Sequence, residues 1–146
     1  MSEELNTLYQ EIILEHNKRP RYYGALASAT HNAEGYNPLC GDRISVFVQI
    51  QSDHIVSLRF QCASCAICKA SASIMVEALQ GQSILEAGVI REQAERLLTS
   101  DSSVTIDCDG EMAALSGVRK FPARIKCAIL PWDTLVNALR GETKKV

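Results

Sequence analysis

The sequence predicts an α+β domain in which several helices pack on one face of a small antiparallel sheet. Two observations carry this prediction. Apolar and polar residues alternate in two neighbouring runs within positions 43–61, which is typical of half-buried strands. Before and after these runs, apolar residues recur at helical spacing. With 146 residues, of which 47% are hydrophobic, the chain 1–146 is expected to form one domain with a single core.

The first predicted elements are a helix and a hairpin. Apolar residues at positions 5, 8, 9, 12 and 13 share one helical face, and Lys18-Arg19-Pro20 should end this helix. Thr30–Tyr36 is expected to form an edge strand. Arg43–Gln51 and His54–Gln61 are predicted to pair as antiparallel strands, because Ser52-Asp53 between them has turn chemistry. The apolar positions of the second hairpin strand are Val56, Leu58 and Phe60.

The period becomes helical from about Ala66, and Gln80-Gly81 should end this helix. Its small residues Ala70-Ser71-Ala72-Ser73 would allow close packing on the sheet. Two shorter helices are expected next, at Ser83–Gly88 and Ile90–Leu98. A polar loop is expected at Thr99–Asp107, with a short extended piece at Val104–Ile106. A helical turn is expected at Glu111–Leu115. The last predicted segment runs from Phe121-Pro122 through Cys127 to Leu139, and it should restart or kink at Pro131.

Composition limits the functional classes. The formal charge of −2 leaves no broad cationic surface for phosphates, so nucleic acid is not expected as a partner. No segment approaches the roughly 20 apolar residues that cross a bilayer, so no membrane role is expected either. The N-terminus lacks the pattern of a signal peptide, which predicts a cytoplasmic protein. In that compartment the six cysteines are expected to be reduced thiols that bind metal or do chemistry, rather than a disulfide scaffold.

Four residues are candidates for a metal site. Cys40-Gly41-Asp42 precedes the hairpin, and Gly41 would let the backbone turn so that the thiolate and the carboxylate aim at one point. Cys65 lies where the second hairpin strand gives way to a helix, whose free N–H groups favour a thiolate. Cys127 follows Arg124 and Lys126, whose positive charge is expected to favour its thiolate as well. Three thiolates and a carboxylate suit zinc, while thiolates also suit an iron-sulfur cluster.

Other residues have weaker claims. Cys62 and Cys68 form a Cys-x2-Cys-x2-Cys run with Cys65, so an alternative ligand set or a bound cluster is open; burial of Cys68 in the core and a strand end at Cys62 are favoured. Cys108, between two aspartates, is expected to be unreactive. Arg124 could stabilise an anionic persulfide or form an ordinary surface ion pair. A ligand role is not favoured for the histidines: His16 should finish the first helix, and His31 and His54 should lie in solvent.

Four segments of the chain closely resemble the SufU branch of the IscU/NifU-like family. The branch is indicated by Lys126, where IscU-type scaffolds have a histidine before the last cysteine, and by the long segment between Cys65 and Cys127. The four segments are Thr7–His16, Asn37–Arg43, Ala70–Ser73 and Phe121–Ala128.

The resemblance implies a three-stranded antiparallel sheet and a zinc-containing protein with Cys40, Asp42, Cys65 and Cys127 at its site. Such a protein accepts persulfide sulfur from a SufS-type cysteine desulfurase and passes it to downstream cluster assembly components. It is sulfurtransferase-like rather than a free-standing enzyme. In the mechanism implied by the family, a histidine of the desulfurase replaces Cys40 on zinc, and the freed thiolate attacks the persulfide.

Two alternatives stay open. The first is a scaffold that assembles and transfers a labile iron-sulfur cluster on Cys40, Cys65 and Cys127, with Cys62 or Cys68 assisting. The second is a domain with a purely structural zinc, which is less favoured because Asp42 would be an unusual ligand in a closed structural site.

Overall fold

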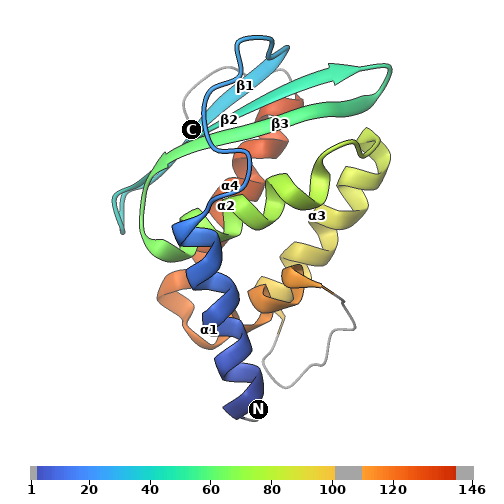
Figure 1. The fold of residues 1–146 in the computed structure, drawn as a ribbon. Coiled ribbons are helices and arrows are strands. Elements are labelled where there is room, and N and C mark those ends of the chain that lie inside the picture. Colours follow the sequence, from blue (N-terminus) through green and yellow to red (C-terminus); the bar gives the residue numbers. More distant parts are fainter. Residues whose placement is uncertain (1–2, 101–109, 141–146) are drawn as a thin grey trace.

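The computed structural model describes residues 3–100 and 110–140, which form helices and one sheet (Figure 1). The extended piece predicted at Val104–Ile106 and Cys108 lie outside these residues. Along the chain the elements are α1 (Glu3–Lys18), β1 (His31–Asn37), β2 (Asp42–Gln51), β3 (His54–Ala63), α2 (Ala66–Leu79), α3 (Ile84–Thr99), the 3₁₀ helix η1 (Glu111–Lys120) and α4 (Pro122–Leu139).

The sheet has three antiparallel strands in the order β1-β2-β3. The predicted hairpin of β2 and β3 and the predicted edge strand β1 are confirmed. Ser52 and Asp53 have φ values of 53° and 60°, so both central residues of the hairpin turn are left-handed, as the twist of paired strands requires.

One strand position was predicted wrongly. Val56 was expected to share the apolar face of Leu58 and Phe60, but it is 44% exposed, while Ile55 is fully buried. The cause is a bulge: the register of β2 and β3 shifts between Gln49 and Ile50, which leaves Val56 as an extra residue on β3. Beyond the bulge, the side chains of β3 change faces.

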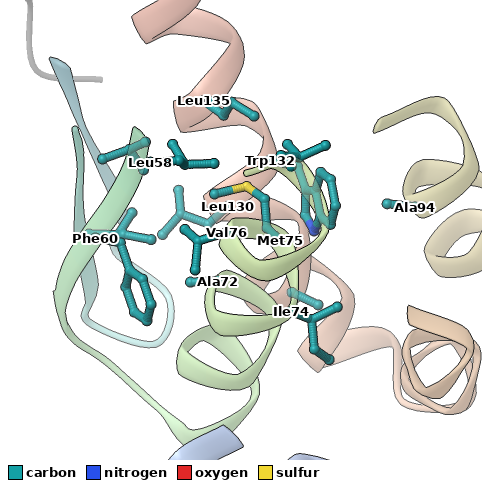
Figure 2. Packing of buried hydrophobic residues seen from close by; sticks show 14 of the residues in the cluster. Leu58, Phe60, Ala72, Ile74, Met75, Val76, Ala94, Leu130, Trp132 and Leu135 are labelled. Atoms are coloured by element: carbon teal, nitrogen blue, oxygen red, sulfur yellow. The ribbon is translucent and has the colours of Figure 1, made fainter. Parts of the chain in front are cut away.

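Helices α2 and α4 cover one face of the sheet, which confirms the predicted fold class (Figure 1). The core lies between these layers. Leu58 and Phe60 of β3 face Val76 of α2, and Trp132 lies on the other side of α2 (Figure 2). Gly35 lets β1 approach α4 closely, because a Cβ atom there would overlap the side chain of Thr134.

Two helix predictions need correction or refinement. Residues 83–98 do not form two short helices but the single helix α3, in which Gly88 is exposed and its missing side chain would meet nothing within 4 Å. A glycine at such a position costs only about 1 kcal/mol, which the buried face of α3 offsets. Helix α4 runs through Pro131 without restarting. In the part of the chain that the structure describes, no helix is long and apolar enough to span a membrane.

Candidate metal centre

The candidate site lies where one end of the sheet meets the starts of two helices. Cys40 stands in the turn between β1 and β2, and Asp42 is the first residue of β2. Gly41 between them has a φ of 72°, a left-handed conformation that confirms its predicted role in the turn. Cys65 is the N-cap of α2, and Cys127 lies in the second turn of α4. Three of the four predicted residues therefore come from element boundaries, and Cys127 comes from the second turn of a helix.

Three of these residues form one compact donor group. The ligand atoms of Cys40, Asp42 and Cys127 all lie within 4.8 Å of one another. The Sγ atoms of Cys40 and Cys127 are 3.2 Å apart. Asp42 and Cys127 are fully buried, whereas Cys40 is exposed. The group thus has two buried members and one thiol that is open to solvent.

Asp42 is held in place by two neighbours. Its Oδ1 accepts a hydrogen bond of 2.9 Å from the backbone N–H of Cys65, which ties β2 to the start of α2. Asn37, which is 7% exposed, donates through Nδ2 to Asp42 Oδ2 at 3.4 Å and to Cys127 Sγ at 3.7 Å. Sequence reasoning did not assign Asn37 to the site. Its only sequence signal was its position before Pro38 in the loop that leads to Cys40.

Cys65 borders the donor group. Its Sγ accepts a hydrogen bond of 3.5 Å from the backbone N–H of Cys68, so the thiol caps α2 and confirms the predicted position at a helix N-terminus. The free N–H groups of that helix end favour negative charge on the sulfur. Cys65 is also near enough to Cys127 to raise the pKa of Cys127.

The pKa of Cys127 departs from the sequence prediction. Arg124 and Lys126 were expected to favour the thiolate, but burial raises the pKa of Cys127, and its contacts with Asp42, Cys40 and Cys65 raise it further. The favourable charge of Arg124, which contacts Cys127, is outweighed by the complete burial of the sulfur beside Asp42, Cys40 and Cys65. A cation bound among these groups would offset the cost of ionising them.

Arg124 lies at the rim of the site. Its contact with Cys127, followed by the charges of Cys65 and Cys40, raises the pKa of the guanidinium. The side chain is fully exposed. Arg124 can therefore meet an incoming anion at the same opening as Cys40.

Cys62 and Cys68 do not join the donor group. Cys68 is fully buried in the core, and burial raises its pKa strongly. Cys62 is half-buried near the end of β3, and burial raises its pKa also. These positions confirm the favoured predictions, a core cysteine and a strand end. Among the other residues, His54 is exposed as predicted, His31 is half-buried, and His16 is completely buried within α1.

A buried polar contact fixes the helix that carries Cys127. Ser71 Oγ on α2 donates to the carbonyl of Ala128 at 2.6 Å and accepts from Trp132 Nε1 at 3.1 Å. All three residues are buried. Because Ala128 follows Cys127 directly, this contact joins α2 to α4 next to Cys127.

The chain is similar to several known proteins. It is 37% identical to the zinc-dependent sulfurtransferase SufU of Bacillus subtilis, over 94% of this chain and 93% of that protein. It is 35% identical to the iron-sulfur cluster assembly scaffold protein IscU of Streptococcus pyogenes, over 94% and 86%. A crystal structure from Fervidobacterium islandicum, of a candidate scaffold for the SUF system, matches with a TM-score of 0.79 and 31% identity over 92% of this chain and 98% of that one.

The family comparison spans all four residues of the candidate site. The model of the NifU-like N-terminal domain matches residues 8–128, a span that includes Cys40, Asp42, Cys65 and Cys127. The chain therefore belongs to the NifU-like N-terminal domain family.

Proposed function

We propose that this protein acts in iron-sulfur cluster assembly as a zinc-dependent acceptor of persulfide sulfur from a SufS-type cysteine desulfurase. One observation carries the proposal: exposed Cys40 lies beside buried Asp42 and Cys127 in a single donor group. A site for metal alone would need no exposed thiol. The named activity of the Bacillus subtilis relative agrees with this reading.

The residues present fit zinc. Cys40, Asp42, Cys65 and Cys127 would hold it, because thiolate and carboxylate ligands suit this ion. Asp42 and Cys127 are polar groups buried in a place where their charges need compensation. When bound, zinc would supply positive charge that keeps the thiols deprotonated.

The burial of the four residues supports a division of labour. Asp42 and Cys127 are enclosed and Cys65 is half-buried and capped, so these three are suited to hold the metal. Cys40 is the sulfur that a partner protein can reach. Its thiolate would attack the outer sulfur of the partner's persulfide, the sulfur-sulfur bond of the partner would break, and the partner's cysteine would leave as a thiolate. Arg124 at the rim would stabilise the new anionic persulfide on Cys40.

Replacement of Cys40 tests the proposal. Cys40→Ala should abolish stimulation of the desulfurase and the gain of one sulfur atom seen by mass spectrometry of the intact chain. Cys62→Ala serves as the control, because this half-buried thiol lies outside the donor group, and it should retain both properties. Undiminished stimulation by Cys40→Ala would refute Cys40 as the acceptor.

A scaffold for a labile iron-sulfur cluster is the second candidate. It is favoured by the similarity to the Streptococcus pyogenes scaffold protein and by the presence of three cysteines at one site. Anaerobic reconstitution with iron and sulfide distinguishes the two functions. A scaffold would give visible absorption that is lost when the cluster moves to an apo-acceptor, whereas a sulfur acceptor would yield a persulfide without a transferable cluster.

A further inference from the structure

A second group of potential metal ligands lies away from the cysteines, where α1, α2 and η1 meet. Nitrogen and carboxylate oxygen atoms of His16, Glu77 and Glu111 all lie within 4.8 Å of one another. We propose that these three residues bind a divalent transition-metal ion of the zinc class, independently of the cysteine centre. The sequence did not favour a ligand role for His16, because a lone histidine is weak evidence for a metal ligand. Glu77 and Glu111 are remote from it along the chain.

The first argument is the buried imidazole. His16 is 0% exposed, and its Nδ1 lies 2.6 Å from Ser73 Oγ on α2. Its Nε2 is buried and lies 3.2 Å from Glu111 Oε1, within ion-pair distance but without the geometry of a hydrogen bond. A buried polar atom without a hydrogen bond is costly, so the position requires an explanation.

The contacts of Ser73 indicate how the ring is oriented. Ser73 Oγ accepts a hydrogen bond of 2.8 Å from the backbone N–H of Arg21, and it shares a hydrogen bond of 2.6 Å with His16 Nδ1. This contact at Nδ1 directs the other ring nitrogen, Nε2, toward the carboxylates. A cation placed between the ring nitrogen and the two carboxylates would interact favourably with all three. Metal-binding histidines commonly donate their other N–H to an oxygen, and Ser73 Oγ lies within hydrogen-bond distance of His16 Nδ1.

The charges around the group are predominantly negative. Glu15, Glu77 and Glu111 face Arg21, whose Nε binds Glu77 Oε2 at 3.1 Å and whose Nη1 lies 3.5 Å from Glu15 Oε2. Arg19 is held by Glu15 at 2.9 Å. Arg21 thus engages one oxygen of Glu77 and leaves the other for a metal.

The ligand types and their exposure define the ion. One imidazole nitrogen and two carboxylates suit zinc, whereas magnesium and calcium prefer oxygen ligands throughout. The side chains of Glu77 and Glu111 are 43% and 41% exposed, so an ion can enter and water can complete its coordination. Bound there, the ion would join α1 and η1 to α2. The adjacent Asn17 already ties α1 to the carbonyl of Ala66 at 2.7 Å, at the start of α2.

Zinc binding to a chain without the cysteine centre tests the proposal. A Cys40→Ser/Cys127→Ser variant should bind one zinc ion per chain in equilibrium dialysis. Adding Glu77→Gln and Glu111→Gln should weaken this binding at least about tenfold. The matched control adds Glu92→Gln and Glu95→Gln on α3, which remove the same charge from exposed positions and should change nothing. Absence of the zinc ion, or equal loss in the control, would overturn the proposal.

A second measurement uses the unaltered chain, in case the cysteine variant folds poorly. Zinc is added beyond the first equivalent while the ring nitrogens of His16 are followed by ¹⁵N NMR. Coordination predicts a shifted Nε2 signal with Nδ1 still protonated. A ring protonated at both nitrogens, or a spectrum unchanged by zinc, would identify a plain ion pair with Glu111 and refute the site. Neither readout depends on sulfur transfer, so failure of this site and failure of the proposed function are distinguishable.

Discussion

Replacement of Ser71 by alanine tests the contact that positions the metal centre. The hydroxyl joins the carbonyl of Ala128 and the indole N–H of Trp132 in a fully buried place between α2 and α4. The alanine side chain has no polar atom, so the indole N–H of Trp132 would lose its acceptor and the carbonyl of Ala128 would lose a donor. No water reaches either group without displacing core side chains, because Ser71 is 0% exposed.

The expected cost follows from the two lost hydrogen bonds. A buried donor left without a partner costs about 1–3 kcal/mol, and loss of an ordinary hydrogen bond to the carbonyl costs about 0.5–1.5 kcal/mol. Together these terms predict that Ser71→Ala lowers the free energy of unfolding by about 1.5–4.5 kcal/mol. With a typical urea dependence, the unfolding midpoint should fall by about 1–2 M urea.

Fluorescence-detected urea unfolding measures this change. Trp132 is the single tryptophan of the chain and is 2% exposed, so its emission reports opening of the contact directly. A double-mutant cycle with Trp132→Phe, followed by circular dichroism, isolates the indole contribution. Ser71→Ala should lower the free energy of unfolding markedly less in the phenylalanine background, because no indole N–H is then left without an acceptor. A cost below about 0.5 kcal/mol in the native background, or equal costs in both backgrounds, would refute the reasoning.

Three further predictions concern packing, thiol chemistry and metal affinity. Gly35→Ala should destabilise the protein by about 1–3 kcal/mol in urea unfolding, because its Cβ would overlap side chains of α4. Gly88→Ala should stabilise the protein by about 0.5–1 kcal/mol. Equal effects of the two substitutions would contradict the packing. In the metal-free protein, iodoacetamide should modify exposed Cys40 well before Cys68, whose burial and raised pKa disfavour the thiolate; peptide mapping would detect the reverse order. Zinc affinity at the cysteine centre, measured in competition with a chelator, should increase from pH 6 to 8. Cys127 has a raised pKa and must release a proton when it binds the metal. An affinity that does not change with pH would argue against Cys127 as a ligand.

The elements were predictable where local pattern decides the structure. Alternation along 43–51 and turn residues at Ser52-Asp53 identify a hairpin without knowledge of the rest of the chain. Local pattern failed where packing decides. Gly88 appeared to divide a helix, yet the buried face of α3 offsets its small cost. The bulge that exposes Val56 depends on how β3 pairs with β2, which the spacing of apolar residues does not record.

The candidate site was likewise predictable where local sequence decides the structure, and not where packing decides it. Positions at element boundaries allowed Cys40, Asp42 and Cys65 to be grouped before the fold was known. The effect of burial on the pKa of Cys127 was not foreseen, because the nearby positions of Arg124 and Lys126 in the sequence gave no measure of it. Support from Asn37 was missed, since it depends on the pairing that places Asn37 opposite Asp42 at the end of the sheet.

The small residues of α2 have a more specific role than the close packing that their size predicts. Ala72 lies in the core, while Ser71 and Ser73 bond to different neighbours: Ser71 to α4, which carries Cys127, and Ser73 to His16 of α1. The two hydroxyls therefore connect α2 separately to the cysteine centre and to the proposed second metal site. Ser73→Ala should weaken zinc binding at His16 and leave the cysteine centre loaded, because it removes the group that orients the imidazole. Two zinc affinities measured on this variant would test that separation, and an equal loss at both sites would show that α2 moves as a unit instead.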